Sequence, residues 1–137
     1  MIAVDTSVAI AAFATWHESH AAALSVVAKQ PSLPAPAALE TYAVLTRLPP
    51  PHRVSGALVA EYIADAFGGR QLSLDADYSS RLLPELVKLG VAGGASYDAV
   101  IAITVREHAA ELVTLDARAR RTYDLVGVRA RLIEGSA

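Results

Sequence analysis

The first residues of the chain constrain its fold more than any other stretch. A short apolar run, Ile2–Val4, has no polar alternation and is followed directly by Asp5. Such a run is typical of a strand that is buried on both faces of a parallel sheet. The residues from Val8 to Phe13 favour a helix, so Asp5 stands where a central strand passes into a helix. In open α/β sheets, active sites collect at this end of the strands, although Asp5 taken alone is better explained as the N-cap of the helix.

Strands and helices alternate along the rest of the chain. The pattern predicts further strands near Leu33 and at Gln71–Leu74, Glu111–Leu115 and Val128–Ile133, and helices at His17–Lys29, Ala37–Leu48, Val54–Phe67, Asp75–Leu89, Tyr97–His108 and Ala117–Leu125. Pro84 is expected to kink or divide one helix, and Ser96 to cap another. The alternation favours a three-layer α/β/α fold with a central, mostly parallel sheet. We expect a single domain over residues 1–137, with a helical excursion between Ala37 and Phe67.

Helical periodicity also predicts which side chains enter the core. Leu39, Leu58 and Phe67 fall on helix faces that we expect to be buried. The helix Tyr97–His108 is apolar nearly all round, which predicts that it is deeply buried. Glu40 and Asp98 are each expected close to the start of their helices.

Composition and charge narrow the classes of protein that remain. The chain has no Cys, which excludes disulfides and thiolate metal sites and fits a cytoplasmic location. Its formal net charge is −2, so it is not a generally basic nucleic-acid binder, and any contact with RNA needs local basic patches or a metal ion. We expect neither a signal peptide nor a membrane span, because Asp5 interrupts the first apolar run and no later run is long enough.

Four of the 14 acidic residues stand apart from the polar helix faces where the others lie. Asp5 and Asp116 each end a predicted strand, and Glu40 and Asp98 each begin an apolar helix. A helix start stabilises any single acid, but this does not explain why all four can reach one edge of a parallel sheet. Crowded carboxylates repel one another unless a cation joins them. Oxygen ligands without Cys or a suitable His pair select Mg²⁺ or Mn²⁺, and such a site favours phosphodiester hydrolysis.

Four segments resemble the motifs of PIN-domain ribonucleases, and the short chain resembles the VapC toxins of toxin–antitoxin pairs. The segments are Met-Ile-Ala-Val-Asp5-Thr-Ser-Val-Ala-Ile, Ala37-Ala-Leu-Glu40-Thr-Tyr-Ala-Val-Leu, Gly94-Ala-Ser-Tyr97-Asp98-Ala-Val-Ile-Ala and Leu112-Val-Thr114-Leu-Asp116-Ala-Arg-Ala. The resemblance implies RNA cleavage that depends on Mg²⁺, for which Mn²⁺ can substitute. It implies that Asp5, Glu40, Asp98 and Asp116 form the catalytic and metal-binding site.

The same resemblance implies supporting residues and partners. Thr6 and Thr114 are expected to orient the acids by hydrogen bonds. A homodimer is expected, with an antitoxin segment covering the site, laid along the helices from His17 to Phe67 as an amphipathic helix. Some relatives carry a further acid after the fourth motif. The segment Ala117–Tyr123 has none, which argues against a second tightly bound metal.

The basic side chains Arg118, Arg120 and Arg121 follow Asp116 closely. They suit contacts with RNA phosphates or antitoxin carboxylates, and they equally suit a solvated helix face. Ser7 stands where haloacid dehalogenases need a second Asp, and no Walker lysine loop or dinucleotide fingerprint occurs. The remaining alternative is a catalytically idle PIN-like module that binds RNA or protein, against which the four intact acids count.

Overall fold

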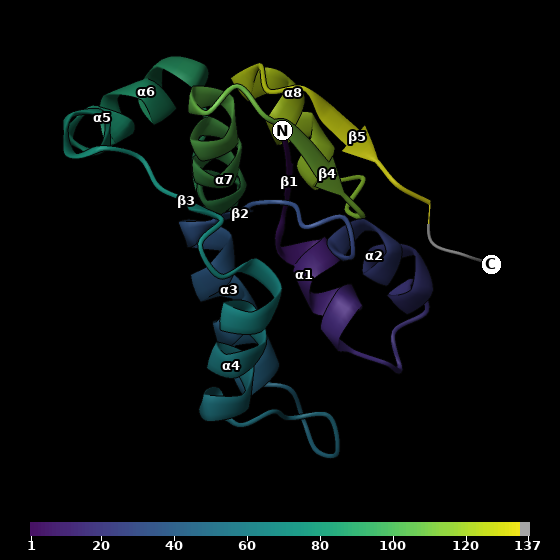
Figure 1. Ribbon diagram of the computed structural model, residues 1–137. Coiled ribbons are helices and arrows are strands. Elements are labelled where there is room, and N and C mark those ends of the chain that lie inside the picture. The colour runs from purple at the N-terminus through teal and green to yellow at the C-terminus, as the bar shows by residue number, and fades with distance from the viewer. Residues whose placement is uncertain (135–137) are drawn as a thin grey trace.

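The computed structural model describes residues 1–134, and within them five parallel strands lie in the order β3-β2-β1-β4-β5 (Figure 1). The strands are β1 (Ile2–Val4), β2 (Leu33–Pro34), β3 (Gln71–Leu72), β4 (Glu111–Thr114) and β5 (Ala130–Leu132). A parallel bridge between Ala3 and Ser32 joins the β2–β3 pair to the other three strands. The register pairs Ile2 with Glu111 and Val4 with Val113. Strands β1 and β4 are therefore parallel neighbours, and their carboxyl ends share one edge, as expected for Asp5 and Asp116.

Helices pack around this sheet as the predicted α/β/α fold requires. They are α1 (Thr6–Phe13), α2 (His20–Val27), α3 (Ala35–Thr46), α4 (Gly56–Phe67), α5 (Ala76–Ser80), α6 (Leu82–Leu89), α7 (Ala95–Glu107) and α8 (Ala119–Val126). Helix α1 contacts α2 and α3, α3 contacts α4 and α7, and α7 contacts α8. Figure 1 shows α3 and α4 side by side, below the sheet and away from α8 and β5; this pair is the expected helical excursion. In the described chain, no helix combines the length and apolar character needed to cross a membrane.

Helix α7 and strand β4 form the centre of the core, as predicted. Ile101, Ile103 and Val105 of α7 and Leu112 of β4 are at most 1% exposed. Each fully buried side chain of this size contributes roughly 1.5–3 kcal/mol through the removal of apolar surface from water. The burial fixes α7 rigidly, and Asp98 lies in its first turn.

The predicted core faces of α3 and α4 are wrong in two places. Leu39 is 71% exposed and Leu58 is 50% exposed. The buried stripes run through Ala37, Thr41 and Leu45 on α3, and through Val59, Ile63 and Phe67 on α4. Each stripe follows the i, i+4, i+8 spacing of a helix face. At 3.6 residues per turn, Leu39 falls on the face opposite its stripe, and Leu58 also lies well away from the buried face of α4.

Several boundaries also differ from the prediction. Helix α2 begins at His20 instead of His17, and α7 begins at Ala95, so Ser96 lies inside the helix and Gly94 takes the N-cap position. Helix α3 begins at Ala35, which places Glu40 beyond the first turn. The predicted division of Asp75–Leu89 is confirmed, but it falls at Arg81. Pro84 lies in the first turn of α6, where a missing N–H leaves no helical bond unmade.

Candidate functional site

Asp5 is buried where β1 ends and α1 begins. Its side chain is the N-cap of α1, because Oδ1 accepts a hydrogen bond from the backbone N–H of Val8 at 3.3 Å. Oδ1 also accepts from Ser7 Oγ at 2.5 Å, and Oδ2 accepts from the phenol of Tyr123 at 2.7 Å. The residue is only 2% exposed. Asp5 therefore caps a helix and also presents a buried carboxylate with several hydrogen-bond donors.

Burial and hydrogen bonding act in opposite directions on Asp5. Loss of water raises the pKa of its carboxyl, and the hydrogen bonds from Ser7 and Tyr123 lower it. Burial and the nearby charge of Asp5 together raise the pKa of the Tyr123 phenol. The phenol therefore keeps its proton at neutral pH and remains a hydrogen-bond donor to Asp5.

Asp116 organises the turn from β4 into α8. Its Oδ1 accepts from the backbone N–H groups of Arg118 at 2.9 Å and Ala119 at 3.2 Å. Its own N–H donates to Thr114 Oγ1 at 2.9 Å. On the neighbouring strand end, Ser7 Oγ accepts from the N–H of Leu115 at 2.9 Å. These bonds tie the ends of β1 and β4 together and hold Asp5 and Asp116 on one framework.

A cavity of about 190 Å³ collects all four acids named by the sequence. It is lined by Asp5, Thr6, Ser7, Ile10, Glu40, Asp98, Asp116, Ala119 and Tyr123. Asp5 and Asp116 come from strand ends, Glu40 from α3 and Asp98 from α7. We refer to it below as the acid cavity.

Burial and the charges of the other acids in this cavity raise the pKa of Asp98. The pKa of Asp98 is raised from its ordinary 3.8 to about 6, first by burial and then by the charges of Glu40, Asp116 and Asp5. Like charges within a few ångströms disfavour ionisation of each other. The cavity is therefore a site where a positive ion would be stabilised.

The donor set fits a hard divalent cation, although the acids are not drawn together into a finished metal centre. Within residues 1–134, no three His, Cys, Asp or Glu side chains stand close enough to hold an ion in common. The buried Thr6 Oγ1 has no hydrogen-bond partner in this part of the chain, and Thr6 is one of the residues that line the cavity. Oxygen ligands of this kind suit Mg²⁺ or Mn²⁺ better than soft metals.

One of the two expected supporting residues bonds to an acid. A side-chain hydrogen bond from Thr114 lowers the pKa of the Asp5 carboxyl, and Thr114 Oγ1 also accepts from the N–H of Asp116 at 2.9 Å. Thr6 Oγ1 has no hydrogen-bond partner within residues 1–134. Ser7 and Tyr123 donate directly to Asp5 and were not named from the sequence. Tyr123 could have been found, because Ala119, Tyr123 and Val126 form the buried stripe of α8 and a buried phenol needs a partner.

The basic residues that follow Asp116 are all exposed. Arg118 lines a second cavity of about 440 Å³, which shares Ser7 and Asp116 with the acid cavity. Arg120 and Arg121 line neither of these cavities. The structure thus brings one of the three predicted basic contacts next to the acids.

Comparison with known proteins places this geometry in context. The PIN domain family matches residues 2–125. Ribonuclease VapC40 of Mycobacterium tuberculosis is 47% identical over 133 residues, covering 97% of this chain and 99% of that protein. Ribonuclease VapC27 of the same species is 41% identical and covers 93% of each chain. The structure of FitAB bound to an IR36 DNA fragment matches with a TM-score of 0.70 at 21% identity, over 96% of this chain and 94% of that chain, which shows the shared fold.

Proposed function

This chain belongs to the PIN-domain family and is a VapC-like ribonuclease, and we propose that Asp5, Glu40, Asp98 and Asp116 bind Mg²⁺ for the hydrolysis of RNA. The observation that carries the proposal is the acid cavity, where four carboxylates from two strand ends and two helices line one space. The raised pKa of Asp98 supports it, because the acids already disfavour each other's charge. A cation relieves this repulsion.

The positions of the side chains support a role for each. Asp5, Asp98 and Asp116 would hold the cation, and Glu40 would be a further ligand, direct or through water. Bound there, the ion supplies positive charge that lowers the pKa of water and neutralises charge developing on the phosphate. Ser7 and Tyr123 fix the carboxylate of Asp5, and Thr114 fixes the turn at Asp116. Mn²⁺ can substitute, since it accepts the same oxygen ligands.

No protein nucleophile is required, and this determines the products. Among residues 1–134, no His, Lys or Cys that could activate a hydroxyl group lines the acid cavity. Hydrolysis by water with departure of the 3′ oxygen leaves 5′-phosphate and 3′-hydroxyl ends. Attack by the 2′-hydroxyl would leave a cyclic phosphate and needs no metal.

Cleavage of cellular RNA with and without EDTA tests the proposal. We expect EDTA to abolish cleavage and excess Mg²⁺ or Mn²⁺ to restore it. Asp5→Asn should abolish cleavage, whereas Asp124→Asn, which changes an exposed acid on α8, should leave it unchanged. Cleavage that persists in EDTA or survives the loss of Asp5, or products with cyclic phosphate ends, would show that the chemistry is different.

A catalytically idle PIN-like module is the competing proposal, and metal binding separates the two. A cation that binds the folded state raises the unfolding midpoint by mass action. We expect Mn²⁺ to raise the midpoint of the parent protein in a saturable manner and to leave that of Asp98→Asn nearly unchanged. An idle module would respond equally in both proteins.

We further propose that residues 1–137 act as one domain, form a homodimer and bind an antitoxin. Exposed apolar side chains support the protein contacts, and Leu24, Leu39 and Leu58 lie in the helices between His17 and Phe67. An amphipathic antitoxin helix would cover such a surface, and a basic side chain of that segment would reach the acids. Each antitoxin segment would then block RNA from the acid cavity.

A further inference from the structure

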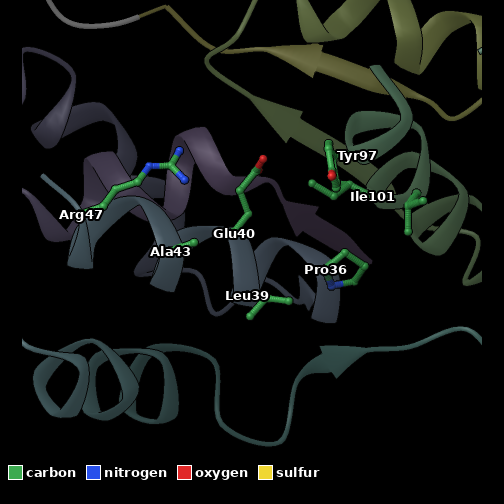
Figure 2. A pocket seen from close by; sticks show the side chains of 8 residues that line it. Pro36, Leu39, Glu40, Ala43, Arg47, Tyr97 and Ile101 are labelled. Carbon is green, nitrogen blue, oxygen red and sulfur yellow. The ribbon is translucent and has the colours of Figure 1, made fainter. Parts of the chain in front are cut away.

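A third cavity opens between α3 and α7 and continues from the acid cavity. It measures about 510 Å³, and Glu40 forms part of the wall of both. Figure 2 shows the side chains of Glu40 and Arg47 extending from α3, with Tyr97 facing them from α7. The other lining residues are apolar: Pro36, Leu39, Ala43, Val100 and Ile101. A chain whose phosphate reaches the acids therefore has an apolar recess beside it.

Two side chains of this recess have no role in holding the fold. Tyr97 is 71% exposed although it is aromatic, and it lies next to Asp98 on the first turn of α7. Arg47 is exposed, and its guanidinium makes no hydrogen bond or ion pair within residues 1–134. An aromatic ring stacks on nucleobases, and a free guanidinium binds phosphate.

A second exposed arginine lies near the acids. The cavity that contains Arg118 and His17 shares Ser7 and Asp116 with the acid cavity. The acid cavity therefore adjoins both the recess that contains Arg47 and the cavity that contains Arg118. Cations beside the acids complement a polyanionic strand whose cleaved phosphate is neutralised by a metal and whose neighbouring phosphates need positive charge.

We propose that the recess between α3 and α7 binds the base of a nucleotide next to the cleaved phosphate of single-stranded RNA. The base stacks on Tyr97 against the apolar wall, Arg47 binds a phosphate of the same segment, and the strand leaves past Arg118. The recess has a volume of about 510 Å³, which leaves room for a nucleobase and falls in the range of small-molecule sites. The recess thus positions the RNA strand at the acids, and the assignment rests on the proposed ribonuclease function.

Binding of a fluorescent single-stranded oligoribonucleotide to Asp98→Asn protein, followed by anisotropy, tests the recess without cleavage. In that background we expect Tyr97→Ala to weaken binding roughly fivefold to a hundredfold, the effect of losing one base–aromatic stack. Tyr97→Phe should restore the affinity because it keeps the ring. Arg47→Gln should reduce the slope of log affinity against log salt by about 0.7, the value for one phosphate contact on a single strand. Arg129→Gln, an exposed arginine just before β5, is the matched control and should change neither quantity.

Activity with two substrates separates the recess from the acid cavity. In otherwise unmodified protein with Mn²⁺, Tyr97→Ala should lower kcat/KM for RNA at least fivefold more than kcat/KM for bis(p-nitrophenyl) phosphate, which has no base. If the parent hydrolyses neither substrate, the proposed function fails, and the anisotropy measurement still decides the recess. Equal affinity of Tyr97→Ala and its parent, or the same salt slope for Arg47→Gln and Arg129→Gln, overturns the assignment. If Tyr97→Ala left the RNA affinity unchanged but altered the sedimentation coefficient, the recess would be a protein contact instead of an RNA site.

Discussion

The negative charge of Asp98 is disfavoured by burial and by the neighbouring carboxylates. Its pKa of about 6, against an ordinary 3.8, means that the folded protein takes up a proton more readily than the unfolded chain. Without metal, stability therefore rises as pH falls from about 7 toward 4, and the ionised form is destabilising above pH 6. The full pKa shift corresponds to a change of about 3 kcal/mol in the free energy of unfolding. Solvent reaches this side chain and screens its charge, so we assign only about 1 kcal/mol of destabilisation to it.

We expect Asp98→Asn to stabilise the metal-free protein at pH 7.5 by about 1 kcal/mol, or roughly 4 °C in Tm, while abolishing RNA cleavage. Thermal unfolding in EDTA between pH 4 and 8 measures this. The advantage of the variant should shrink as pH falls below 6, because Asp98 of the parent then becomes neutral. Asp124→Asn should show no such pH-dependent gain. A variant that fails to fold would mean that Asp98 is needed structurally.

Tyr123 donates a hydrogen bond to Asp5, which lies near the other end of the chain. We expect the loss of this hydrogen bond to weaken metal binding as well as to lower stability. Tyr123→Phe removes a hydrogen bond to a charged group, which costs about 1.5–3 kcal/mol, and groups that orient a metal ligand typically change affinity or activity 10–100-fold. Tyr62→Phe is the matched control, because its phenol donates to the backbone carbonyl of Ala9 at 2.7 Å and touches no acid.

Urea unfolding and Mn²⁺ titration calorimetry compare these two tyrosine variants. Both should lose stability, and only Tyr123→Phe should lose Mn²⁺ affinity and RNA cleavage. Equal Mn²⁺ affinity in the two variants would restrict Tyr123 to a structural role.

The four acids could be predicted from sequence because each stands at a strand end or near a helix start, where chain order fixes its position. Ser7 and Tyr123 depend instead on which rotamers meet across β1, β4 and α8, and periodicity does not give this. Leu39 and Leu58 were misplaced because a shift in helix phase moves a residue off the buried stripe. The contact between Thr114 and the backbone of Asp116 likewise depends on the local turn.

The helices were easier to predict than their ends. Apolar periodicity located α7 and α3, but their first residues depend on local turns at Gly94 and Pro34. The far end of α7 holds a polar cluster that links α7 to three other helices. Arg106 donates to Glu85 of α6 at 2.8 Å, to the carbonyl of Val126 of α8 at 2.9 Å, and to Tyr78. The two ends of α7 thus have separate tasks, with Asp98 at one end and this anchor at the other.

Arg106→Lys tests that separation. Lysine keeps the charge but lacks the planar fork that serves several acceptors at once, so we expect a loss of about 1–2 kcal/mol in the free energy of unfolding. With Mn²⁺ at saturation and below the unfolding temperature, kcat for RNA should be unchanged. A fall in kcat without a change in stability would show that the anchor communicates with the acids.

The surface of the molecule predicts its assembly. Leu58 on α4 and Leu83 on α6 are exposed apolar side chains that a second copy of the chain could cover. We expect the purified chain to be a homodimer at micromolar concentration, which sedimentation equilibrium measures. The antitoxin should form a stoichiometric complex that no longer cleaves RNA. A monodisperse monomer that no partner inhibits would contradict both expectations.

The pairing of β1 with β4 joins the beginning of the described chain to its last quarter, and this has a consequence during synthesis on the ribosome. A nascent chain that has emerged only as far as α6 already has Asp5 and Glu40, but it has neither the neighbouring strand nor Tyr123. Contacts so distant in sequence form late. We therefore expect the nuclease to remain inactive until α8 has left the exit tunnel of the ribosome, so that an antitoxin made during this time can bind the toxin as soon as it folds.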